Sequence, residues 1–133
     1  MLAEQADRLI GVDTHRDSHT AAVVESQTGV VGASETAAAD RRGHRRLLAF
    51  ADEQAPGRRA WAIESTGSYG AGLAAFLSER GERVLEVDRP QRRARRSGAK
   101  SDELDAIRAA REALARAHPA QPRARGDREA VRV

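Results

Sequence analysis

Four acidic residues stand where regular secondary structure is expected to begin or end. Asp13 follows the apolar run Leu9-Ile10-Gly11-Val12, and Glu64 closes the alternating segment 59–64. Asp102 and Asp105 are three residues apart near the start of a predicted helix, so they share one of its faces. Converging carboxylates repel each other unless a cation joins them, and their hard oxygen atoms suit Mg²⁺ or Mn²⁺. We therefore predict that these four acids hold divalent metal and serve as catalytic groups in phosphodiester chemistry.

Each acid also has a simpler interpretation. Asp102 and Asp105 could only favour the dipole at the start of their helix, and Glu64 could be an ordinary charge at an exposed strand end. Asp13 is harder to explain in this way, because the apolar strand before it predicts burial, and a buried charge is costly without a partner. His15 and His19 are candidates for metal or phosphate contacts, but the pattern favours exposed or locally bonded histidines.

The elements that would position these acids alternate in a recognisable order. We predict strands at 8–13, 19–25, 30–35, 59–64 and 83–87, and helices at 40–54, 70–80 and from 101 to about 117. This order, β-β-β-α-β-α-β-α, predicts an α/β fold with a mixed five-stranded sheet and helices on its faces, as in the ribonuclease H-like fold. In that fold the first and fourth strands are neighbours, which would place Asp13 beside Glu64.

The composition limits the class of protein. The chain has 133 residues and no cysteine, which excludes disulfides and thiolate metal sites and suits a cytoplasmic protein. No apolar run approaches the roughly 18 residues of a membrane span. Of the 23 basic residues, all but Lys100 are arginine, a side chain that binds phosphate oxygen atoms bidentately.

The basic residues are concentrated in segment 89–100, which contains no acid. Such a segment beside an acidic cleft would hold a phosphate backbone, and its alternative is a solvated arginine-rich loop. The residues predicted to bind nucleic acid are Arg92, Arg93, Arg95, Arg96 and Lys100.

Three blocks give the chain a specific resemblance. Residues 10–15 (Ile-Gly-Val-Asp-Thr-His), 64–69 (Glu-Ser-Thr-Gly-Ser-Tyr) and 100–106 (Lys-Ser-Asp-Glu-Leu-Asp-Ala) resemble the N-terminal half of the DEDD transposases of the insertion-sequence 110 family and the related Piv-type DNA invertases. The resemblance covers about residues 8–117. The four-acid motif of the family falls on Asp13, Glu64, Asp102 and Asp105.

The resemblance implies a RuvC-like, Mg²⁺-dependent domain that acts on DNA, with a structured bridge RNA as a further partner and a homo-oligomer as the full-length protein. It also implies a second domain with a nucleophilic serine, and no serine of this chain matches it. We expect residues 1–117 to form the RuvC-like domain and residues 118–133 to be a polar tail, the truncated start of a linker to the serine domain. Such a chain is expected to be inactive alone. Two alternatives stay open: a non-catalytic nucleic-acid-binding remnant and a nuclease of the Holliday-junction-resolvase type.

Overall fold

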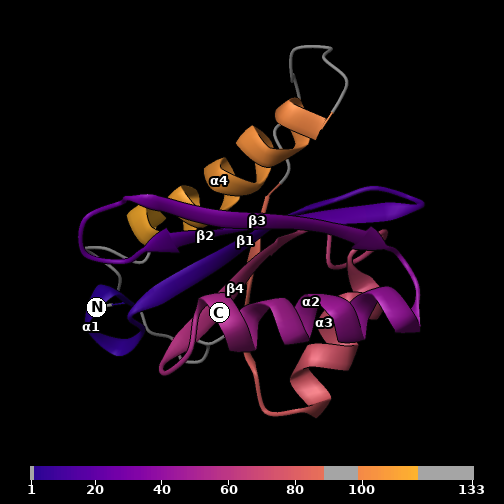
Figure 1. The fold of residues 1–133 in the computed structure, drawn as a ribbon, viewed down its shortest axis with the longest axis horizontal. Coiled ribbons are helices and arrows are strands. Elements are labelled where there is room, and N and C mark those ends of the chain that lie inside the picture. The colour runs from indigo at the N-terminus through magenta and orange to yellow at the C-terminus, as the bar shows by residue number, and fades with distance from the viewer. Residues whose placement is uncertain (1, 89–98, 117–133) are drawn as a thin grey trace.

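The computed structural model describes residues 2–88 and 99–116 as one sheet flanked by helices (Figure 1). The elements are α1 (Leu2–Gln5), β1 (Arg8–Thr14), β2 (Ser18–Glu25), β3 (Val31–Ala38), α2 (Arg41–Gln54), β4 (Arg59–Glu64), α3 (Ala71–Glu79), β5 (Arg83–Val87) and α4 (Ala99–Arg116). The predicted order is confirmed, with the short helix α1 in addition and a third strand that continues three residues beyond the predicted end. Within the described residues, no helix has the length and apolar character needed to cross a membrane.

The five strands lie in the order β3-β2-β1-β4-β5. The first three form an antiparallel meander, whereas β4 runs parallel to both β1 and β5. This mixed sheet is the predicted ribonuclease H-like arrangement. Because β1 and β4 are parallel neighbours and Val12 is level with Ile63, the residues that follow, Asp13 and Glu64, end up side by side at one edge of the sheet.

Alternating side chains of the strands build two separate cores. Ile10, Val12, Trp61 and Ile63 pack with α2 and α3 on one face. The opposite face carries Leu9, Val24 and small alanines, and α4 alone among the long helices covers it (Figure 1). Asp13 and Glu64 continue the α4-facing series of their strands, because side chains two residues apart point to the same face.

Helix α4 lies unusually close to β1. Its buried side toward the sheet consists largely of alanine, and Gly11 faces it from the strand. A Cβ atom at Gly11 would come within 1.9 Å of the Ala106 carbonyl oxygen, which is far inside any allowed contact. The small residues at this crossing therefore let the helix bring its own acids close to the strand ends.

Candidate functional site

The strand-borne half of the site is fully buried. Asp13 and Glu64 are both 0% exposed, and the Thr14 hydroxyl donates a hydrogen bond of 3.2 Å to the Glu64 backbone carbonyl. This bond ties the end of β1 to the end of β4. The two carboxylates are therefore fixed by the sheet itself rather than by a flexible loop.

The helix-borne half comes from the first two turns of α4. Asp105 is buried and Asp102 is half-buried, and both are directed toward the strand ends. Asp102 also occupies the first turn of the helix, where a negative charge is favoured by the dipole. The structure thus brings the four predicted acids to one end of the sheet, as two strand-end carboxylates and two helix carboxylates.

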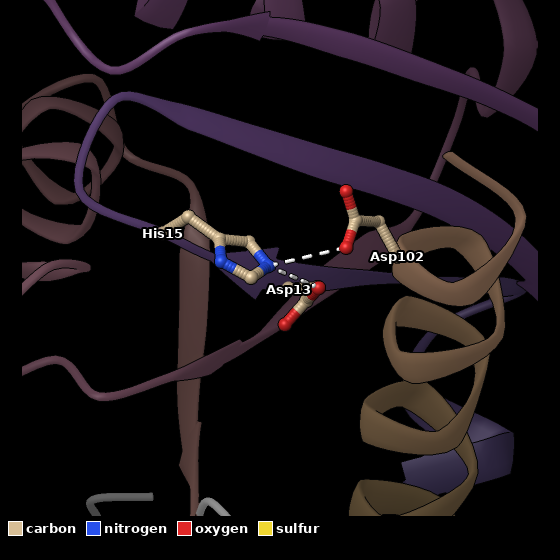
Figure 2. A group of neighbouring side chains, drawn as sticks. All are labelled: Asp13, His15 and Asp102. Carbon is tan, nitrogen blue, oxygen red and sulfur yellow. Dashed lines mark hydrogen bonds and ion pairs between the residues drawn. The ribbon is translucent and has the colours of Figure 1, made fainter. Parts of the chain in front are cut away.

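His15 joins Asp13 to Asp102 (Figure 2). Its Nε2 atom donates to Asp13 Oδ2 at 2.8 Å and lies 3.3 Å from Asp102 Oδ1. One ligand atom from each of the three residues lies within 4.8 Å of the other two, which is close enough for a shared metal ion. Sequence reasoning left His15 outside the site, although the Asp13-X-His15 spacing in extended chain puts both side chains on one side.

Arg108 joins the other two acids. Its Nη2 atom lies 3.1 Å from Glu64 Oε2 and 3.6 Å from Asp105 Oδ1. This residue was also missed from the sequence. The available signal was its position three residues after Asp105, which places both side chains on one helix face.

His19 lies on the other face of the sheet and is not part of the acidic group. It is buried and stacks on His44, with ring centroids 5.9 Å apart. Burial, together with the nearby His44 and His15, lowers the pKa of His19 to about 4. The ring is therefore neutral at pH 7 and belongs to the core beneath α2.

Among the residues predicted to bind nucleic acid, Lys100 is described and exposed in the first turn of α4. It borders an open pocket with Thr20, Thr36 and Glu103, and Thr20 is the cross-strand neighbour of Asp13. Lys100 thus lies on the surface that adjoins the acidic site. The other four, Arg92, Arg93, Arg95 and Arg96, fall outside the described residues.

The fold and the site together define a ribonuclease H-like domain with a carboxylate centre at the ends of its central strands. The family model for the transposases of the IS110 DEDD family matches residues 10–132. The chain therefore belongs to this transposase family, and DNA is the partner that membership in the family implies. Among curated proteins, none matches the sequence.

Proposed function

We propose that this chain supplies the metal-dependent catalytic centre of an insertion-sequence transposase, which cleaves and joins DNA strands. The observation that carries the proposal is the convergence of ligand atoms from Asp13, His15 and Asp102 within 4.8 Å of one another. Family membership supports DNA as the substrate, and the ribonuclease H-like sheet provides the rigid frame on which a carboxylate centre is built.

The donor set fits a divalent ion. Carboxylate oxygen atoms suit Mg²⁺ and Mn²⁺, whereas an imidazole nitrogen shifts the preference toward transition metals such as Mn²⁺. A bound ion would act as a Lewis acid on the phosphodiester group and help to generate its nucleophile. Asp13, Glu64, Asp102 and Asp105 remain the residues we assign to this centre, with His15 added.

The exposure of these residues gives the centre an open side. The side chain of Asp13 is completely buried, but those of Asp102 and His15 are 28% and 43% exposed. Asp13 is therefore the buried ligand of the centre, while Asp102 and His15 lie on the exposed side, from which a phosphate group can approach. Lys100 and the arginines of segment 89–100 are proposed to hold the DNA or RNA backbone beside it.

Isothermal titration of Mn²⁺ into the wild-type chain and Asp13→Asn tests this proposal. We expect saturable binding by the wild type and loss of binding in the variant, because Asp13 is the buried ligand. Asp17→Asn is the matched control, since Asp17 is an exposed acid in the turn after β1. Negligible binding by the wild type, or equal binding by wild type and Asp13→Asn, would contradict the metal centre.

Further features are proposed from family membership. We infer that the chain works in the cytoplasm, that it acts together with a serine-bearing transposase domain, and that a bridge RNA and a homo-oligomer form part of the active complex. We expect strand exchange when a separately produced serine domain and an element-encoded RNA are added to the chain. Failure of the combination to exchange strands, with Mn²⁺ binding intact, would reject this assembly.

A further inference from the structure

The four acids of the site are divided into two pairs, and a different basic side chain bridges each pair. His15 lies between Asp13 and Asp102, whereas Arg108 lies between Glu64 and Asp105. The close group of ligand atoms at this site contains the first pair with His15, and neither Glu64 nor Asp105 belongs to it. The two halves of the acidic centre therefore differ in what they can bind.

Arg108 already pairs with the two oxygen atoms that an ion between Glu64 and Asp105 would use. An ion held by Glu64 Oε2 and Asp105 Oδ1 would lie about 2.1 Å from each oxygen. Arg108 Nη2 already lies 3.1 and 3.6 Å from these same two atoms. A guanidinium group is always protonated in proteins, so a divalent ion bound to the same two oxygen atoms would meet a like charge.

The surroundings hold Arg108 in this position. The residue is anchored on α4, one turn beyond Asp105, and only about a third of its side chain is exposed. Its Nη1 atom is buried and has no hydrogen-bond partner among the described residues. The guanidinium group therefore pairs with the carboxylates of Glu64 and Asp105, although its Nη1 atom has no acceptor there within the described part of the chain.

We propose that Arg108 takes the place of a second metal ion, so that the centre binds a single divalent ion at Asp13, His15 and Asp102. This inference rests on the proposed metal centre. It gives Glu64 and Asp105 a role distinct from direct coordination: they hold the positive charge of Arg108 beside the ion. Arg108 is therefore a positioning residue, which acts through Glu64 and Asp105 on the charge beside the ion.

The test counts Mn²⁺ ions on the full chain by isothermal titration and by electron paramagnetic resonance, which detects coupling between ions about 4 Å apart. We expect one uncoupled ion in the wild type and two coupled ions in Arg108→Gln, which removes the charge and keeps much of the side-chain length. Arg108→Lys should bind one ion, because it keeps the charge. Arg111→Gln is the matched control on the same helix, where Arg111 donates to the Gly29 carbonyl at 2.9 Å.

A second variant keeps the inference testable even where Arg108→Gln does not fold. Asp105→Asn should still bind one Mn²⁺, about tenfold more weakly than the wild type, because a nearby charge is lost but no ligand. Two ions in the wild type, an unchanged single ion in folded Arg108→Gln, or loss of binding in Asp105→Asn would each overturn the inference while leaving the metal centre in place. No binding by the wild type would instead contradict the proposed function, and the inference with it.

Discussion

Gly11→Ala should separate helix α4 from the sheet and weaken both the fold and the metal centre. The added Cβ would lie 1.9 Å from the Ala106 carbonyl oxygen and 2.8 Å from the Ala110 backbone nitrogen. Both are backbone atoms of α4, so no side-chain rotation relieves the overlap. The helix must retreat by roughly 1.4 Å to restore an ordinary C···O contact of about 3.3 Å.

The size of the effect follows from this displacement. Overpacking of a core costs typically about 1–3 kcal/mol, and a clash with backbone belongs at the upper end of that range. The retreat also carries Asp102 away from Asp13, by more than the tolerance of about 0.2 Å that metal–ligand distances allow. We therefore expect about 3 kcal/mol less stability and at least about tenfold weaker Mn²⁺ binding.

Equilibrium urea unfolding followed by far-ultraviolet circular dichroism measures the first effect, and Mn²⁺ titration of the folded variant measures the second. Gly67→Ala is the control, because a Cβ atom there has nothing within 4 Å. An unchanged urea midpoint in Gly11→Ala would refute the close packing of α4. A lowered midpoint with wild-type Mn²⁺ affinity would refute the link between that packing and the metal centre.

Three further predictions address the histidines and the basic segment. His15→Ala should lower Mn²⁺ affinity more than Mg²⁺ affinity, because imidazole is the donor that favours the transition metal; an equal loss for both ions would place His15 outside the coordination shell. The pKa of His19 is about 4 in the folded chain against 6.5 for the free side chain, so the unfolded chain binds more protons between these values and stability must fall as the pH drops through them. Between pH 7 and pH 5 the free energy of unfolding should fall by about 2 kcal/mol, which urea unfolding measures. His19→Gln should lack this loss of stability. A variant with the wild-type pH dependence would contradict the lowered pKa of His19. The last prediction replaces four arginines of segment 89–100 with alanine: Arg92, Arg93, Arg95 and Arg96. The slope of log affinity against log salt concentration for duplex DNA should become smaller by about 0.9 for each lost phosphate contact. An unchanged slope would show that these arginines have no role in binding.

The sequence was sufficient to predict the mixed five-stranded sheet and the neighbouring positions of its first and fourth strands. Burial of Asp13 followed from the apolar run before it, and its position next to Glu64 followed from the ribonuclease H-like order of elements. The bridging residues could not be predicted in the same way. Whether His15 also reaches Asp102, and Arg108 also reaches Glu64, depends on how closely α4 approaches the sheet, and element order alone says nothing about that distance.

The close approach of α4 explains why packing and chemistry cannot be separated in this domain. The helix meets β1 through Gly11 and through alanines such as Ala106, Ala109 and Ala110, which are all buried. Larger side chains at this crossing would bury more apolar area, but they would lift Asp102 and Asp105 away from the strand ends. Since ligand atoms must converge within a few ångströms to share an ion, a helix displaced by the width of one methyl group would separate the helix-borne acids from the strand-borne acids. The small residues at the crossing are therefore as necessary to the proposed centre as the acids themselves, and variants that enlarge them should lose metal binding without touching a ligand.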